Sequence, residues 1–175
     1  MTVREILLLG NPKLYEISKP AEKSELHKIK ILIEDLHDTL MDFKAKFGAG
    51  RAIAAPQIGV MKRLIYMYTD KSFVFVNPSL DKLNPHMVEV WDDCMCFPDL
   101  LVKVNRHKTC TISYYDMDWE WKKMDLEDDL SELLQHEYDH LDGILAVSKA
   151  IDGKSFALRS QRELLNRSLG KGEKQ

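Results

Sequence analysis

The segment from Gln135 to Gly143, which reads QHEYDHLDG, contains the motif H-E-x-x-H and constrains the fold more than any other part of the chain. Residues four apart share one face of a helix, so His136 and His140 can present two imidazoles to one metal ion. Glu137 stands beside the first histidine, where a carboxylate can take a proton from metal-activated water. The motif predicts a helix that faces a hydrolytic metal site. The rest of the chain must supply a third ligand, an oxyanion donor and a substrate cleft.

Length and composition favour one globular domain. The 175 residues are 45% hydrophobic and 30% charged, and a chain of this length buries about 70% of its unfolded surface. The net charge of −3 gives no argument for nucleic acid or an anionic membrane as a partner, and no apolar run reaches the roughly 18–20 residues of a membrane span. We expect residues 1–169 to form a single catalytic domain in the cytoplasm, without a cleaved targeting segment, and residues 170–175 to be a disordered tail.

Hydrophobic spacing predicts an α+β fold, with small antiparallel or mixed sheets around the motif helix and an N-terminal and a C-terminal helix outside them. The first helix is expected between Ser24, as its N-cap, and Gly48. The motif helix is expected over 127–141 with Gly143 as its stop, and the last helix over 154–169. Runs rich in β-branched and aromatic residues predict strands over 64–68, 73–76, 87–91, 101–104, 109–115 and 119–123, the last two joined by a turn at 115–118.

The third metal ligand decides the class of hydrolase, and two candidates stand out. Glu163 could complete the site of an H-E-x-x-H zinc peptidase, whereas Ala146 excludes the protease pattern that needs a further histidine there. Cys94, at the end of a predicted strand, would give with two imidazoles a sound ligand set for Zn²⁺ or Fe²⁺ with one open position. Taken alone, such a cysteine is more often a buried apolar residue.

A third segment, Gly50–Gly59 (GRAIAAPQIG), combines small residues with one side-chain amide. Small residues let a substrate backbone approach closely, and the amide of Gln57 can donate to a developing oxyanion. By itself this pattern more often marks tight helix packing.

Together the three segments resemble the peptide deformylase family, which carries G-x-G-x-A-A-x-Q, E-G-C-L-S and Q-H-E-x-D-H in this order. The third block matches completely as QHEYDH, and the first matches as GRAIAAPQ with Ala52 in place of the second glycine. In the second block, DDCMC keeps only the cysteine. The similarity extends over roughly residues 3–149.

The resemblance implies one divalent metal ion per chain, with Fe²⁺ favoured and Zn²⁺, Co²⁺ or Ni²⁺ also compatible with sulfur and imidazole ligands. The ligands would be Cys94, His136 and His140. A carboxylate, that of Glu137, would carry the proton from water to the departing amine. The oxyanion would be stabilised by the side-chain amide of Gln57 and the backbone N–H of Met95.

The substrate implied by the resemblance is an N-formyl peptide or a nascent chain that begins with formylmethionine, met as it leaves the ribosome. Formate would be released. Three residues would pair their backbone with the peptide as an added strand, and three would surround the methionine side chain. They are Gly50, Arg51 and Ala52 for the backbone, and Ile53, Phe97 and Leu133 for the side chain.

The degraded second block leaves two other functions open: a non-catalytic metal-binding relative, and a deformylase of another formylated amine. Asp93 replaces a glycine, so we expect strain if that backbone needs positive φ, together with added negative charge beside the metal. Asp92 is expected to pair with Arg106, and Cys96 to pack as a small apolar residue. Residues 99–101 lack the basic residue that some family members use to hold the peptide backbone. The oligomeric state is not indicated.

Overall fold

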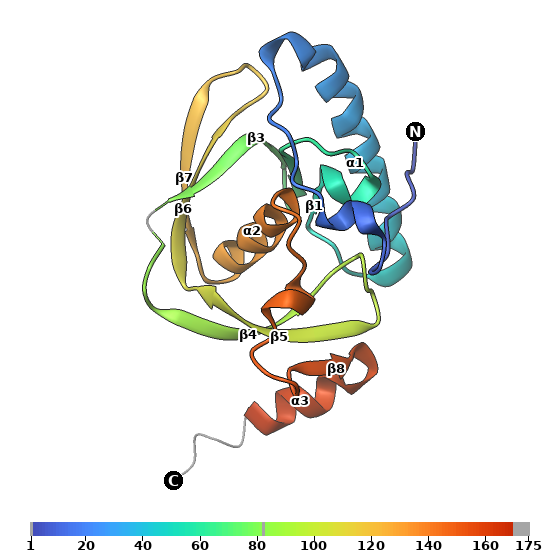
Figure 1. The fold of residues 1–175 in the computed structure, drawn as a ribbon, viewed down its shortest axis with the longest axis vertical. Coiled ribbons are helices and arrows are strands. Elements are labelled where there is room, and N and C mark those ends of the chain that lie inside the picture. The colour runs from blue at the N-terminus through green and yellow to red at the C-terminus, as the bar shows by residue number, and fades with distance from the viewer. Residues whose placement is uncertain (1, 82, 170–175) are drawn as a thin grey trace.

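The computed structural model describes residues 2–81 and 83–169, with side chains described as far as residue 165. Residues 170–175, which the sequence predicts to be a tail, lie outside this part. Within the described residues, two antiparallel sheets and three α-helices form the fold (Figure 1). The helices are α1 (Leu26–Phe47), α2 (Asp128–Leu141) and α3 (Arg162–Leu169). This architecture confirms the predicted α+β class.

The strands divide into a five-stranded and a three-stranded sheet, and every pair of neighbours is antiparallel. The larger sheet has the order β1 (Ala52–Ala54), β2 (Leu64–Tyr68), β3 (Ser72–Asp81), β6 (Thr109–Tyr115), β7 (Trp121–Glu127). The smaller has the order β4 (Met87–Asp93), β5 (Leu100–His107), β8 (Phe156–Leu158). The six predicted strands are all present, whereas β1 and β8 were not predicted from the sequence.

The motif helix α2 lies between the two sheets (Figure 1). Its apolar face, with Leu134 and Leu141 fully buried, packs on the larger sheet. Gly143 ends the helix, as predicted, with φ of 69°. A Cβ at this position would lie 2.5 Å from the carbonyl oxygen of Tyr15, so the close approach of that backbone also requires glycine.

Helix α1 covers the outside of the larger sheet with an amphipathic face. Ile29, Leu36, Leu40 and Phe43 are buried against strands and the 3-10 turn Ala55–Ile58. The helix ends at Phe47, before a left-handed glycine at position 48. The predicted N-cap is wrong: Ser24 lies inside the 3-10 turn Lys23–Glu25, and Glu25 precedes the helix instead.

The structure of the C-terminal segment differs most clearly from the sequence prediction. Instead of one helix over 154–169, the chain forms β8, a 3-10 turn (Arg159–Gln161) and the short helix α3. Strand β8 satisfies its backbone by pairing with the edge of β5, in register Leu100↔Leu158. The side chains of Phe156 and Leu158 are therefore largely exposed, because the sheet edge and not an amphipathic face decides the conformation. Among the described helices, none has the length and apolarity needed to cross a membrane.

Candidate metal centre and its cleft

Three possible metal ligands meet where the end of β4 approaches α2. The Sγ of Cys94 lies 3.3 Å from Nε2 of His140, which lies 3.2 Å from Nε2 of His136. All three side chains are buried. In the described part of the chain, these residues form the one group of at least three ligand-type side chains with their ligand atoms within 4.8 Å of one another. Glu163 lies in α3 and is not part of this group, so the structure does not support a peptidase site.

The separations of His140 Nε2 from the other two ligand atoms, 3.3 and 3.2 Å, are close to those around a tetrahedral cation. Bonds of about 2.0–2.1 Å to nitrogen and about 2.3 Å to sulfur place neighbouring ligand atoms about 3.3–3.6 Å apart at tetrahedral angles. Burial lowers the pKa of His140, with a further contribution from the nearby His136, so its imidazole keeps a free lone pair. Burial also raises the pKa of the Cys94 thiol, which would lose its proton on binding a metal. The donor set therefore suits Zn²⁺ or a similar divalent ion.

A buried ion network orients one of these imidazoles from behind. Asp92 Oδ1 lies 2.9 Å from Nδ1 of His136, the distance of an ion pair when the imidazole is protonated. Its Oδ2 accepts from Nη2 of Arg106 at 2.6 Å, which confirms the predicted Asp92–Arg106 pair. Arg106 also donates to Asp139, which accepts from Nζ of Lys149 at 2.8 Å. A carboxylate at Nδ1 leaves Nε2 of the histidine for a metal.

The network shifts the protonation of both members of the His136–Asp92 pair. Burial alone would lower the pKa of His136, but the charge and contact of Asp92 outweigh it and raise that pKa to about 9. Burial would raise the pKa of Asp92, yet His136 and Arg106 lower it well below its usual range. The carboxylate thus stays ionised, and a metal at Nε2 would take over the role of the proton on the imidazole.

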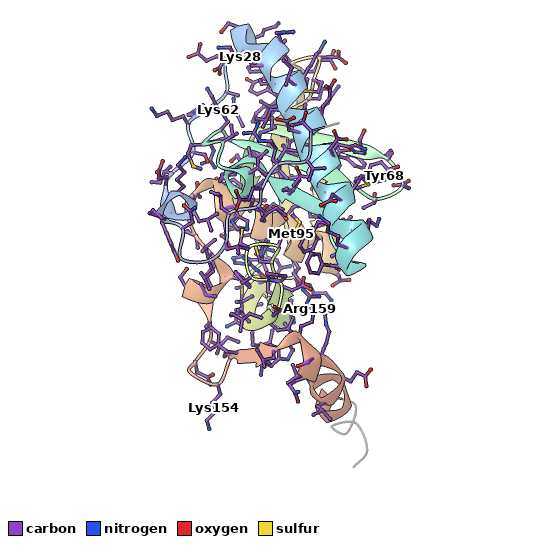
Figure 2. The ribbon with its side chains drawn as sticks, turned by 90° about the vertical axis from the view of Figure 1, so that its right-hand side faces the viewer. Lys28, Lys62, Tyr68, Met95, Lys154 and Arg159 are labelled. Atoms are coloured by element: carbon purple, nitrogen blue, oxygen red, sulfur yellow. The ribbon has the colours of Figure 1, made fainter. Side chains whose placement is uncertain are left out.

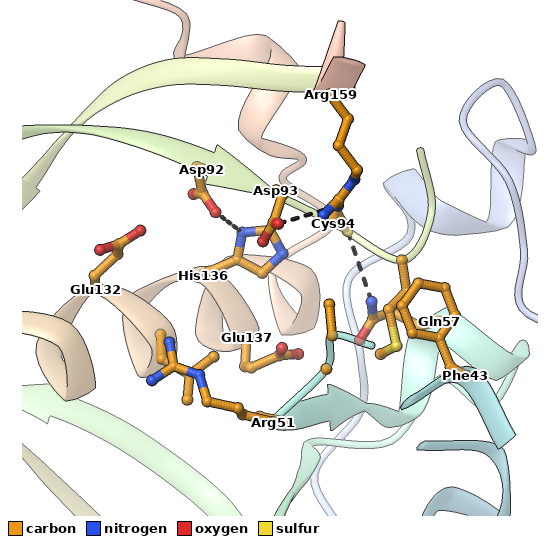
Figure 3. Close-up of a pocket in the computed structure, with 15 residues that line it drawn as sticks. Phe43, Arg51, Gln57, Asp92, Asp93, Cys94, Glu132, His136, Glu137 and Arg159 are labelled. Carbon is orange, nitrogen blue, oxygen red and sulfur yellow. Dashed lines mark hydrogen bonds and ion pairs between the residues drawn. The ribbon is translucent and has the colours of Figure 1, made fainter. Parts of the chain in front are cut away.

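Glu137 and Gln57 bring proton-transfer and hydrogen-bonding groups to the same site (Figure 3). Burial raises the pKa of Glu137 to about 7, with the positive charge of His136 acting in the opposite direction. Its Oε2 is buried and has no partner in the described chain. Gln57 accepts from the backbone N–H of Ala54 at 2.7 Å, which directs its Nε2 to within 3.7 Å of the Cys94 sulfur.

A tight turn carries the cysteine ligand and its neighbours. The N–H of Phe97 donates to the carbonyl of Cys94 at 3.1 Å, and the N–H of Cys96 lies 3.4 Å from the Cys94 sulfur. Met95, between them, lines the cleft. Cys96 is buried in an apolar cluster, as predicted, and its sulfur lies 3.7 Å from Nε2 of Gln57.

Not all predicted substrate residues reach the cleft. Gly50, Arg51, Ala52 and Leu133 line it. Ile53 is fully buried against α1, since successive side chains of β1 point to opposite faces and Ala52 takes the cleft side. Phe97 is buried in the cluster beneath the smaller sheet. The complete lining is Phe43, Ala49, Gly50, Arg51, Ala52, Gln57, Asp92, Asp93, Cys94, Met95, Glu132, Leu133, His136, Glu137 and Arg159.

The mouth of this cleft is more charged than the sequence predicts. Arg51 forms a two-pronged ion pair with Asp129. Glu132 lies one helical turn before His136, and burial, with the charges of Asp92 and Asp129, raises its pKa to about 7. Glu132 and His136 are four residues apart on one helix, so the sequence alone could have placed this carboxyl on the same helix face as His136.

Asp93 and Arg159 complete the mouth of the cleft, and Arg162 lies beside Asp93 in a neighbouring hollow. Asp93 is not among the described non-glycine residues with positive φ, so the expected backbone strain is absent. Its carboxylate lies 3.0 Å from Nη2 of Arg159 and 3.4 Å from Nη1 of Arg162. Figure 2 shows Arg159 between Met95 and the C-terminal helix. No sequence signal pointed to these two arginines, because their approach depends on the unpredicted strand β8.

Comparisons with known proteins agree with the geometry. A family model described as polypeptide deformylase matches residues 3–155. A peptide deformylase from Pseudothermotoga lettingae is 34% identical over 159 residues, which cover 91% of this chain and 90% of that protein. A peptide deformylase from Legionella pneumophila superposes with a TM-score of 0.77 at 30% identity, covering 97% of this chain and 95% of that one. A class I type b peptide deformylase from Acinetobacter baumannii, solved with Met-Ala-Ser bound, has a TM-score of 0.77 at 25% identity, covering 85% of this chain and 98% of that one.

Proposed function

The chain belongs to the polypeptide deformylase family, and we propose that Cys94, His136 and His140 hold its metal and that Glu137 moves the proton. The protein is a hydrolase that removes the N-formyl group from newly made polypeptides. One observation carries the assignment of residues: Glu137, whose Oε2 has no partner in the described chain, and the Gln57 amide line the same cleft as Cys94 and His136.

The family is metal-dependent, and for this chain we propose Fe²⁺, with Zn²⁺, Co²⁺ and Ni²⁺ as compatible ions. Bound at Cys94, His136 and His140, such a cation would supply positive charge that polarises the formyl carbonyl and makes water a better nucleophile. The burial of the three ligands keeps this charge in surroundings of low polarity, where it acts strongly.

Glu137 is the proposed proton carrier. A carboxyl with a pKa near 7 can accept a proton from water as the water attacks the formyl carbon, and can then give that proton to the departing amine. The hydroxide from water bonds to the formyl carbon, the C–N bond breaks, and the products are formate and a free amino terminus. Burial of the carboxylate keeps it poised between its two protonation states.

Gln57 and the backbone N–H of Met95 are the proposed oxyanion donors. The Gln57 amide is fixed through its oxygen by Ala54, which leaves its NH₂ group facing the cleft. The turn's own hydrogen bonds come from the N–H groups of Cys96 and Phe97, so the N–H of Met95 is available to a substrate. Donors held in place before the reaction stabilise developing negative charge without reorganising.

The substrate backbone is proposed to lie beside Gly50, Arg51 and Ala52. These residues lead into β1, the outer strand of the five-stranded sheet, where an extended peptide can add as a further strand. Leu133 contributes apolar surface for the first side chain. We further propose that residues 1–169 act as one catalytic domain on nascent chains that leave the ribosome in the cytoplasm.

The test is formate release from formyl-Met-Ala-Ser by protein loaded anaerobically with Fe²⁺, and in parallel with Co²⁺. The matched control is Glu137→Gln, which keeps the size of the side chain and the three ligands. We expect turnover by the parent protein, and a loss of about 10²–10⁴-fold in kcat with metal content unchanged in the variant. Stoichiometric metal without turnover of any formyl amide would instead favour a non-catalytic metal-binding protein.

A further inference from the structure

In the described part of the chain, two guanidinium groups line the cleft, and they differ in which of their nitrogens are already engaged. Both terminal nitrogens of Arg51 donate to the carboxylate of Asp129. Arg159 donates from Nε to the carbonyl of Pro98 at 2.6 Å, and its Nη2 forms an ion pair with the Asp93 carboxylate at 3.0 Å. These contacts of Arg159, within the described chain, leave Nη1 for another acceptor. Among the described residues that line the cleft, Arg159 is therefore the arginine with a terminal nitrogen that makes no contact of its own.

The fold fixes the position of Arg159 through its backbone as well. Its N–H donates to the carbonyl of Asp99 at 2.8 Å, directly after β8 has paired with β5. Pro98 and Asp99 belong to the turn that follows the metal ligand, and Asp93 immediately precedes that ligand. The guanidinium is thus held at both ends of the segment that carries Cys94, and Figure 3 shows its contact with Asp93.

The position of the Arg159 guanidinium determines which part of a bound substrate it can contact. A formyl amide bound with its carbonyl at the ligand trio must extend away from the trio through the cleft that Arg159 lines. A peptide offers backbone carbonyl oxygens along that path, and a fixed guanidinium is well suited to bind them. The Arg159 side chain is 30% exposed, so a substrate can contact it without breaking its ion pair with Asp93.

We propose that Arg159 is a substrate-binding residue whose Nη1 donates to a backbone carbonyl oxygen of the peptide beyond its first residue. Asp93 is its positioning residue: the carboxylate holds the guanidinium at the cleft and compensates its charge in the absence of substrate. This inference rests on the proposed function of the same cleft. It assigns a purpose to two features that the reaction itself does not use, namely the aspartate beside Cys94 and the strand that returns the C-terminal segment to the site.

Arg162 offers a matched control on the same carboxylate. Its Nη1 lies 3.4 Å from Asp93, but it lines a neighbouring hollow with Trp91 and Asp129 and not the metal cleft. Like Arg159→Ala, Arg162→Ala removes one positive charge near Asp93, but it leaves the Arg159 guanidinium in the cleft. Arg159→Lys keeps the charge but loses the forked geometry.

The experiment compares two neutral substrates, formyl-Met-Ala-Ser amide and formyl-methioninamide, which differ in the backbone beyond the first residue. For Arg159→Ala we expect KM for the longer substrate to rise about tenfold, as for loss of a charged hydrogen bond. We expect kcat for both substrates, and KM for the short one, to stay within about twofold. Arg159→Lys should recover part of the loss, and Arg162→Ala should behave as the parent. Thermal unfolding of each variant checks that the fold is kept.

Three results would overturn the proposal: equal losses of Arg159→Ala on both substrates, no loss on the longer one, or the same loss in Arg162→Ala. Should the parent hydrolyse no formyl peptide, the proposed function fails, and binding of Met-Ala-Ser amide and methioninamide by calorimetry then decides the inference. Selective weakening of the longer ligand by Arg159→Ala would still support it, and equal affinity of parent and variant would refute it.

Discussion

Two groups of ion pairs flank the proposed metal centre, one behind it and one at the mouth of the cleft, and they differ in burial. Behind the ligands, the side chains of Arg106 and Asp92 are 1% and 5% exposed. At the mouth, those of Arg51 and Asp129 are 42% and 67% exposed. Loss of the buried pair is therefore expected to destabilise the fold strongly, and loss of the exposed pair only weakly. The reason is that water solvates and screens charges only where it reaches them.

The largest expected effect comes from breaking the buried group. Arg106→Met leaves the carboxylates of Asp92 and Asp139 without this cation, and should lower the free energy of unfolding by about 3–5 kcal/mol. Denaturant unfolding of the metal-free protein measures it. Arg51→Met, in the exposed pair, is the matched control and should cost under about 1 kcal/mol. Similar losses in both variants would show that burial does not separate the two groups.

A smaller effect is expected on metal affinity. Asp92→Asn removes the charge that orients Nδ1 of His136, and loss of such a partner typically weakens metal binding about 10–100-fold. Competition with a chromophoric chelator gives the affinity. Asp93→Asn removes a neighbouring carboxylate that faces Arg159 and Arg162 instead, and should change the affinity by much less. A reversed order of the two variants would contradict the assignment of Asp92 behind the ligand.

Glu132 lies between the two extremes, and its partial burial predicts a pH-dependent contribution. Its pKa is raised from 4.5 to about 7, so the folded state holds the proton more tightly than the unfolded state does. The carboxyl therefore stabilises the fold below its ordinary pKa, and this contribution is lost as the pH rises through about 7.

Glu132→Gln should accordingly gain stability relative to the parent as the pH rises from about 5 to about 8. Because the carboxyl is partly exposed, we expect about 1 kcal/mol, or about 2–4 °C in Tm. Glu127→Gln, which changes an exposed carboxyl at the end of β7, is the matched control. A difference in Tm that stays constant with pH would refute the raised pKa.

The smallest effect is expected at the exposed pair itself. Asp129→Asn should change the free energy of unfolding by no more than about 0.5 kcal/mol, and the difference should disappear in about 1 M salt. Parallel unfolding curves at low and high salt measure this. A loss that persists at high salt would place the Arg51–Asp129 pair with the buried group.

The parts of the fold that could be predicted depend on local pattern. The motif helix, its glycine stop and six strands carry their own periodicity and end signals, so the sequence located them. Arg106 was inferred as the partner of Asp92, and the structure confirms it. Strand β8 was taken for helix because Phe156 and Leu158 are equally compatible with either, and only the open edge of β5 distinguishes them.

By itself, the sequence determined which residues are candidates for the proposed metal site, because a possible metal ligand, base or amide donor is recognisable from residue type and spacing. Only the tertiary structure decided which side chains share the cleft. In the structure Ile53 and Phe97 are buried in the core, and Arg159 lines the same cleft as Cys94. The physical reason is that ligand chemistry is a property of each residue, whereas burial and pairing are properties of contacts between segments far apart in the chain.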